Sequence, residues 1–276
     1  MVEYVPERRY DTVFFDLYGT LVDIRTDEES PAAWEALREV LEDHSGVTFR
    51  DAAELKARFD ALAAPVLARA AGARGGNAEP DLLPVYAALA AEDTVVVDPA
   101  ARDPQAIAMA DVADLTDLGP MVLPWALQLA RTFRRASTSL LRLYPGAAAM
   151  LARLREAGLT VVLVSNAQSG YTRPELRGLD LEPLFDNIVI SSEVGVRKPS
   201  PRIYRIALDG VLADPGRTVM VGNDERADIL GAKGAGIDGI YLRTAISPQD
   251  DPQSSAYAVL SLDGPDYAGL MKYLGV

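Results

Sequence analysis

The stretch that most constrains this sequence is Asp11–Asp23, an apolar run followed by an acidic residue and a glycine. Its β-branched and aromatic residues are typical of a buried strand, and Asp16 falls where that strand should end before a turn at Gly19. Ligands bind outside the carboxyl ends of the strands in open α/β sheets. Asp16 is therefore a candidate nucleophile or metal ligand, and the alternative is that it only caps a turn.

The composition argues against several classes of function. The sequence has no cysteine and a single histidine, His44, which excludes thiolate chemistry and argues against a histidine-based triad or zinc site. Forty acidic residues against 27 basic ones give a net charge of −13, which disfavours nucleic acid as a partner. No apolar segment has the length of a membrane span or a signal peptide, so we expect a cytoplasmic protein that does not contact a membrane.

Residues 25–143 have the pattern of helices. Ser30 followed by Pro31 is typical of a helix start, and Gly46 should end that helix. Further helices are expected at residues 51–71, 82–91 and 121–143, with weak periodicity between the last two.

After Gly146 the pattern changes to strands alternating with helices. Near-continuous apolar runs of this kind are typical of parallel strands that are buried on both faces. The expected strands are 159–164, 188–190, 218–221, 239–242 and 257–260. The predicted fold class is α/β, with a doubly wound parallel-sheet core from residues 1–24 and 144–276 and an all-α domain, residues 25–143, inserted into it.

Four of the expected core strands are followed by a polar cluster. The clusters are Asp16, Ser165-Asn166, Arg197-Lys198-Pro199, and Asn223-Asp224 with Asp228. One such cluster would mean little, because strands generally end in polar turns. Four of them at one sheet edge supply a carboxylate nucleophile, groups that bind oxyanions, a cation and oxygen ligands for a hard metal ion.

With these clusters the sequence resembles the haloacid dehalogenase-like hydrolase superfamily, whose four motifs match in order and spacing. Motif one appears as the variant Asp16-Leu17-Tyr18-Gly19-Thr20. Ser165-Asn166 resembles motif two, Lys198-Pro199 resembles motif three, and the segment from Gly222 to Asp228 resembles motif four. The helical insertion lies where the family has its cap domain.

The resemblance implies a chemistry in which Asp16 attacks the substrate and carries it covalently. Mg²⁺ and Lys198 would offset the repulsion between a carboxylate and a phosphoryl group. Ser165 and the backbone N–H of Asn166 would bind phosphoryl oxygens, with help from Thr20 and the turn at Gly19. Magnesium ligands would come from Asp16, the carbonyl of Tyr18 and a set drawn from Asn223, Asp224 and Asp228.

Two residues depart from the family's phosphatase pattern. Tyr18 stands where most family phosphatases have the aspartate that serves as general acid and base, and a phenol with a reference pKa near 10 is a poor base at neutral pH. Asn223 stands at the usual position of a metal-binding aspartate, so it offers an oxygen without a charge.

Three functions remain open. The first is a Mg²⁺-dependent phosphatase that acts on a small phosphorylated molecule. The second is a metal-free 2-haloacid dehalogenase with the same nucleophile, since such enzymes carry tyrosine at the place of Tyr18; a tyrosine six residues after Lys198, Tyr204, is another point of likeness. The third is a member of the family that binds a phosphorylated ligand with little turnover.

Substrate choice should lie in the inserted helices, because cap helices close over the site and exclude water. Arg134 and Arg135 are the candidate contacts to the far end of the substrate, and the alternative for both is a solvated helix face. Exposed helices in the insertion are compatible with a homodimer.

Overall fold

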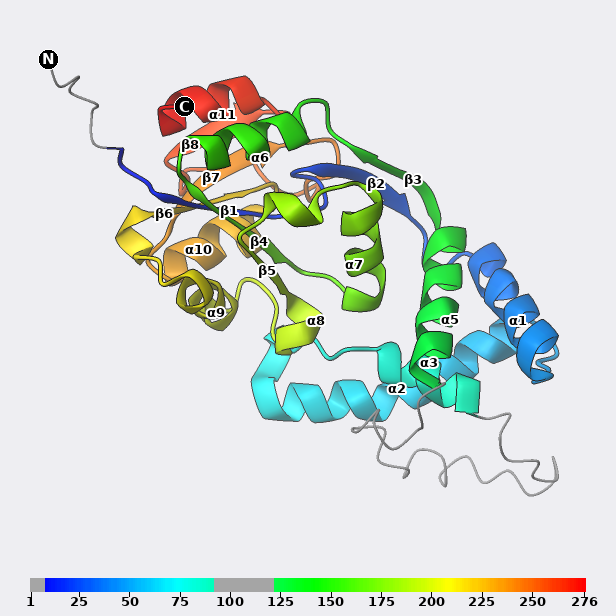
Figure 1. Ribbon diagram of the computed structural model, residues 1–276. Coiled ribbons are helices and arrows are strands. Elements are labelled where there is room, and N and C mark those ends of the chain that lie inside the picture. Colours follow the sequence, from blue (N-terminus) through cyan, green and yellow to red (C-terminus); the bar gives the residue numbers. More distant parts are fainter. Residues whose placement is uncertain (1–7, 92–121) are drawn as a thin grey trace, which may run out of the picture. The chain divides into compact units, whose positions relative to one another are not determined.

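The computed structural model describes residues 8–91 and 122–276 (Figure 1). By its internal contacts the chain divides into an α/β unit and a helical unit. The α/β unit contains residues 1–24, 141–167 and 173–276, and the helical unit contains residues 25–140 and 168–172. The sequence predicts bounds at 24 and 144 and does not anticipate that residues 168–172 join the helical unit.

The α/β unit is built on a six-stranded parallel sheet with the strand order β5-β4-β1-β6-β7-β8. Its strands are β1 (Thr12–Phe15), β4 (Thr160–Ser165), β5 (Asn187–Ile190), β6 (Thr218–Gly222), β7 (Asp238–Arg243) and β8 (Leu260–Asp263). β1 lies between β4 and β6, with Phe15 level with Leu163 on one side and Val221 on the other. The residues that follow these strands therefore meet at one edge.

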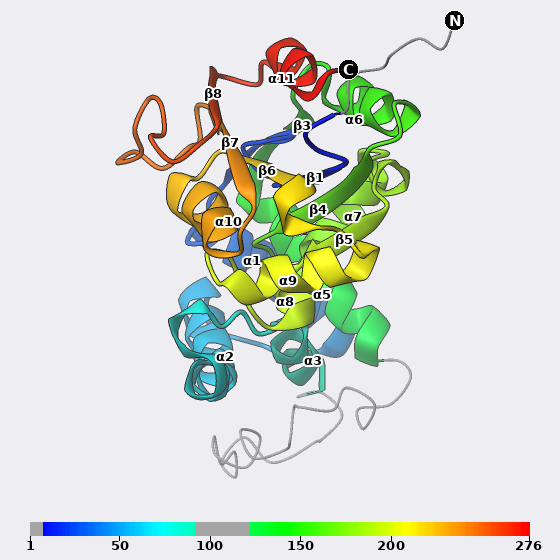
Figure 2. The same cartoon turned by 90° about the vertical axis from the view of Figure 1, so that its left-hand side faces the viewer.

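Helices cover both faces of this sheet, as the sequence predicts (Figures 1 and 2). Alternate residues of β1 point to opposite faces, so Val13 and Phe15 belong to one apolar cluster and Phe14 to the other. α6 (Ala147–Glu156), α7 (Ser169–Gly178) and α11 (Tyr267–Leu274) contribute to the first cluster. α9 (Pro201–Val211) and α10 (Gly231–Gly234) contribute to the second, and α8 (Ser191–Val194) follows β5. The doubly wound α/β class is confirmed.

The helical unit has an aromatic core. In its described residues the α-helices include α1 (Pro31–Ser45), α2 (Ala52–Arg74), α3 (Leu83–Ala91) and α5 (Val122–Ser137). Trp34 lies with its ring centroid 4.6 Å from Phe133 and 5.3 Å from Phe59, and Tyr86 lies 5.0 Å from Phe59. The helices expected from Pro31 and over residues 82–91 are confirmed, and Gly46 ends α1 with a φ of 71°.

The helix expected over residues 121–143 is wrong in its last part, because the chain forms strand β3 (Thr138–Leu143) after Ser137. The hydroxyls of Ser137 and Thr138 both donate to the carbonyl of Arg134, at 3.1 and 2.6 Å, and so end α5. β3 pairs with β2 (Val22–Thr26) in a two-stranded sheet that the sequence analysis did not anticipate.

The last strand lies three residues later than predicted, at Leu260 instead of Tyr257. The preceding backbone turns instead, and its N–H groups find side-chain partners: Ser255 donates to Ser261 Oγ at 3.0 Å and Tyr257 to Ser255 Oγ at 3.2 Å. No helix among the described residues has the length and apolar character required to cross a membrane.

Candidate active site

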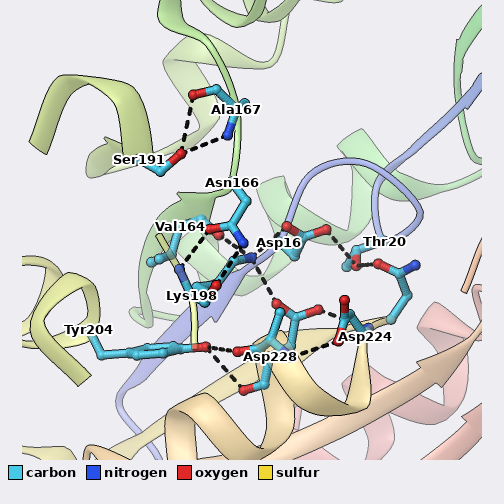
Figure 3. A network of polar contacts seen from close by, with 12 residues as sticks. Asp16, Thr20, Val164, Asn166, Ala167, Ser191, Lys198, Tyr204, Asp224 and Asp228 are labelled. Carbon is cyan, nitrogen blue, oxygen red and sulfur yellow. Dashed lines mark hydrogen bonds and ion pairs between the residues drawn. The ribbon is translucent and has the colours of Figure 1, made fainter. Parts of the chain in front are cut away.

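Asp16 lies at the carboxyl end of β1, at the edge where the register brings the polar clusters together (Figure 3). Its backbone N–H donates to Val221 of β6 at 3.0 Å, which continues the sheet pairing by one residue. The Asp16 side chain is 11% exposed, so the carboxylate is largely buried but open to a ligand.

Lys198 is the centre of the polar network in Figure 3. Its ammonium lies 2.6 Å from Asp16 Oδ1, 2.8 Å from the carbonyl of Val164 and 2.8 Å from Asp228 Oδ1. Burial alone would lower the pKa of Lys198, but the charges of Asp16 and Asp228 outweigh it and hold the pKa above its ordinary value. Two of the lysine's N–H donors thus form hydrogen bonds, and the ion pair with Asp228 adds to the interactions that keep its charge in the site.

Asn166 fixes the backbone of Lys198 with its side chain. Asn166 Oδ1 accepts from the Lys198 N–H at 2.8 Å, and Nδ2 donates to the Lys198 carbonyl at 3.0 Å. Ser191 fixes the backbone of Ala167, the residue after Asn166, in the same way. Its hydroxyl accepts from the Ala167 N–H at 2.8 Å and donates to the Ala167 carbonyl at 3.2 Å. The side chain of Asn166 is therefore a positioning group, and its backbone N–H remains the candidate donor to an oxyanion.

Ser165 contributes a buried hydroxyl with no protein partner. Its side chain is fully buried, and among the described residues no hydrogen bond is found for Oγ. Buried polar atoms without a protein partner are rare in folded proteins, and a ligand oxygen or a bound water would supply one here. This observation fits the predicted role of Ser165 at the phosphoryl oxygens.

Thr20 connects Asp16 to motif four. Its Oγ1 lies 3.3 Å from Asp16 Oδ2 and 3.2 Å from Asn223 Oδ1. The turn at Gly19 is tight, with a φ of 91°, and a Cβ there would lie 2.3 Å from Asn223 Nδ2. Only glycine permits this approach, which sets the Asn223 amide against the turn that follows Asp16.

The two acidic side chains of motif four are engaged within their own turn. Asp224 Oδ1 accepts from the Ala227 N–H at 2.6 Å, and Asp228 Oδ2 accepts from the Asp224 N–H at 3.0 Å. Burial raises the pKa of Asp228 to about 7, although the Lys198 charge lowers it. Tyr204 is fully buried, and its hydroxyl donates to the carbonyls of Ala227 and Asp228, so it supports the π-helical turn η6 (Glu225–Leu230).

The residues around Thr20 fit a hard cation such as Mg²⁺. Asp16 Oδ2 and Asn223 Oδ1 flank one hydroxyl, and both are oxygen donors of the kind that magnesium prefers. No group of three carboxylate or histidine side chains suited to a metal ion occurs in the described part of the chain. All five metal ligands expected from the sequence, Asp16, Tyr18, Asn223, Asp224 and Asp228, therefore remain predictions.

Tyr18 points its hydroxyl at a residue that the sequence analysis missed. The phenol donates a hydrogen bond to Glu175 Oε2 of α7, 157 residues away in the chain.

Arg134, in the helical unit, pairs with Glu28 at 3.3 Å and lies over the ring of Tyr171, and Arg135 is exposed. Roles of these two arginines in substrate binding remain predictions.

Comparisons with known proteins identify the family of this sequence. A sequence model of haloacid dehalogenase-like hydrolases matches residues 10–236. A phosphoserine phosphatase of Thermus thermophilus is 37% identical over 113 residues, which are 41% of this chain and 45% of that protein. The chain spans about half the length of the curated relatives that it matches.

Two solved structures share the fold over nearly the whole of both chains. A 2-haloacid dehalogenase from Pseudomonas syringae has a TM-score of 0.57 at 20% identity, with 96% of this chain and 98% of that chain covered. A phosphatase of the same superfamily from Thermococcus onnurineus has a TM-score of 0.53, the same identity and the same coverage. Since the family model covers most of the sequence and its motifs meet at one sheet edge, the chain belongs to the haloacid dehalogenase-like hydrolases.

Proposed function

We propose that the protein is a Mg²⁺-dependent phosphatase that hydrolyses a small phosphomonoester through a phosphate carried on Asp16. The observation that supports this most directly is the grouping of Asp16, the Lys198 ammonium and the unpartnered hydroxyl of Ser165 at one edge of the sheet. A nucleophile, a fixed cation and a free donor are the three groups that phosphoryl transfer needs from a protein.

Each residue has a distinct part in this reaction. Asp16 attacks phosphorus with a carboxylate oxygen, and Lys198 offsets the repulsion between that carboxylate and the phosphoryl group. Ser165 Oγ and the backbone N–H of Asn166 donate to the phosphoryl oxygens. Asp16, Asn223 and the carbonyl of Tyr18 would hold Mg²⁺, which when bound would supply further positive charge against the phosphoryl group.

Steady-state hydrolysis of p-nitrophenyl phosphate with Mg²⁺ and with a chelator tests the proposal. We expect turnover that requires the metal and is lost in Asp16→Asn, a variant that keeps the size of the side chain. Circular dichroism of the variant controls for its fold. An absence of metal-dependent turnover in the wild-type protein, or full activity in Asp16→Asn, would remove the proposal.

A second candidate function is metal-free hydrolysis of a 2-haloacid by the same nucleophile. Tyr18 favours it, because a departing halide needs no proton from an acid at that position. The measurement that separates the two functions is halide release from 2-chloropropionate in the presence of a chelator. Release without metal, and no phosphatase activity with it, would favour the dehalogenase.

A further inference from the structure

We infer that Thr244 and Tyr267 are positioning residues that act on Asp16 through the turn that follows it. Their hydroxyls hold the backbone of Thr20, and the Thr20 hydroxyl in turn directs the Asp16 carboxylate. The inference rests on the proposed function only in taking Asp16 as the reacting group. Both residues lie beyond residue 236, where the match to the family model ends, and the sequence analysis did not identify either of them.

The turn after Asp16 uses its own N–H groups locally. The N–H groups of residues 20–22 all donate to the Leu17 carbonyl, at 2.8 to 3.3 Å, and that of Gly19 donates to the Val22 carbonyl at 2.8 Å. The carbonyls of Gly19 and Thr20 take no part in these bonds, although both residues are buried. Buried backbone carbonyls are almost always paired, so these two require partners from elsewhere in the chain.

Thr244 supplies the partner of the first carbonyl. Its Oγ1 donates to the Gly19 carbonyl at 2.8 Å, across 225 residues of sequence. Thr244 directly follows β7, and Ser247 closes a small buried turn around it. The Thr244 N–H donates to Ser247 Oγ at 3.1 Å, and the Ser247 N–H donates to the Thr244 carbonyl at 3.1 Å. These bonds fix the backbone from which the Thr244 hydroxyl reaches Gly19.

Tyr267 supplies the partner of the second carbonyl. It is the first residue of α11, and its hydroxyl donates to the Thr20 carbonyl at 2.7 Å. Its ring is buried in the apolar cluster on the α6 face of the sheet. Burial raises the pKa of Tyr267 above its ordinary value, so the hydroxyl keeps its proton and remains a donor at neutral pH.

Together the two bonds hold Thr20 from both sides, because one carbonyl belongs to the peptide before it and the other to the peptide after it. The fixed backbone sets the direction of Thr20 Oγ1, which lies 3.3 Å from Asp16 Oδ2 and 3.2 Å from Asn223 Oδ1 (Figure 3). Lys198 holds the other Asp16 oxygen at 2.6 Å, so Thr20 fixes the rotation of the carboxylate. A reacting group misplaced by about 1 Å can lose about 100-fold in rate.

The test removes each hydroxyl at nearly constant side-chain size and measures hydrolysis of p-nitrophenyl phosphate with Mg²⁺, well below the unfolding temperature. We expect Thr244→Val and Tyr267→Phe each to lower kcat/KM by about 5- to 100-fold, because the attacking carboxylate loses its direction. The inhibition constant of inorganic phosphate should change by less than about threefold, since the groups that bind the phosphoryl oxygens are untouched. Thr244→Ser keeps the hydroxyl and should retain most of the wild-type activity.

Two matched controls remove buried hydroxyls at the other end of the same sheet. Thr218, the first residue of β6, donates to the Asp214 carbonyl at 2.7 Å, and Tyr10, just before β1, donates to Asp238 Oδ2 at 2.7 Å. Thr218→Val and Tyr10→Phe should lower the denaturation midpoint comparably but leave kcat/KM within about twofold of the wild type.

The Thr20→Val background shows whether the effect passes through Thr20. Without the Thr20 hydroxyl, Thr244→Val should lower kcat/KM by less than about twofold, although it lowers kcat/KM at least about fivefold in the wild-type background. A general loss of stability would lower activity equally in both backgrounds.

Two results would overturn the inference while leaving the proposed function in place. One is wild-type kcat/KM in Thr244→Val or in Tyr267→Phe, and either variant suffices if the other does not fold. The other is an equal effect of Thr244→Val with and without the Thr20 hydroxyl.

A wild-type protein that releases halide but hydrolyses no phosphate would remove the proposed function alone. Asp16 is the nucleophile in both candidate functions, so the same variants would then be compared by halide release. Equal losses there would support the inference, and unchanged rates would overturn it. Inactivity of the wild-type protein toward both substrates would overturn the proposed function and the inference together.

Discussion

Removal of the Lys198 ammonium should destabilise the protein strongly, because it would leave two buried carboxylates without their cation. The side chains of Lys198 and Asp228 are each 1% exposed and that of Asp16 is 11% exposed. Removing one partner from a buried ion pair costs about 3–5 kcal/mol. Lys198→Met keeps the length of the side chain and so leaves no large cavity.

That loss is measurable by urea denaturation in a chelating buffer, where no divalent ion contributes. With a slope of about 3 kcal/mol per molar urea, a loss of about 4 kcal/mol lowers the midpoint by about 1.3 M. Circular dichroism and hydrogen exchange in the strands are the suitable probes, because Trp34 and Trp125 both lie in the helical unit and would not report on this site.

The double variant Lys198→Met/Asp228→Asn separates lost charge pairing from a simple packing defect. It removes the more deeply buried of the two unpaired carboxylates and should therefore recover part of the lost stability. Arg9→Met is the matched control, because Arg9 pairs with Asp238 at 2.7 Å on the surface and should change stability by less than about 1 kcal/mol. A loss below about 1 kcal/mol in Lys198→Met, or no recovery in the double variant, would refute the reasoning.

Three further predictions concern other parts of the structure. Gly19→Ala should abolish turnover of p-nitrophenyl phosphate, since its Cβ would meet the Asn223 amide at 2.3 Å; activity near wild type would contradict this. Ser191→Ala should lower the free energy of unfolding in urea by about 0.5–1.5 kcal/mol, because it removes the partner of the partly buried Ala167 N–H; no change would contradict this. Burial raises the pKa of Tyr86 and of Tyr171 above 10, so stability is complete below about pH 10 and falls above it. The denaturation midpoint should fall less steeply with rising pH in Tyr86→Phe than in the wild-type protein. An equal slope in the two proteins would show that Tyr86 and Tyr171 do not cause the fall.

Much of the α/β unit could be predicted from local patterns. The apolar runs before Asp16, Ser165 and Asn223 identify three central strands, because a strand buried on both faces must be apolar throughout. The end of α5 was missed for a local reason. The hydroxyls of Ser137 and Thr138 compete for a helix carbonyl, and periodicity does not register this competition.

The hydrogen bonds that hold the residues of the candidate site in place could not be predicted from local patterns. Glu175 and Ser191 carry no motif, and each acts on a residue that lies near it only after folding. Asn166 was expected to act through its backbone, and the structure adds that its side chain holds Lys198.

The sequence by itself determined which residues end each strand, and hence which chemical groups reach the sheet edge, because hydrophobic periodicity and turn residues act over a few neighbours. Only the tertiary structure decided that Lys198 lies between Asp16 and Asp228 and that the hydroxyl of Tyr18 donates a hydrogen bond to Glu175. These contacts join segments far apart in the chain, and strand order and register, which no local pattern specifies, bring those segments together.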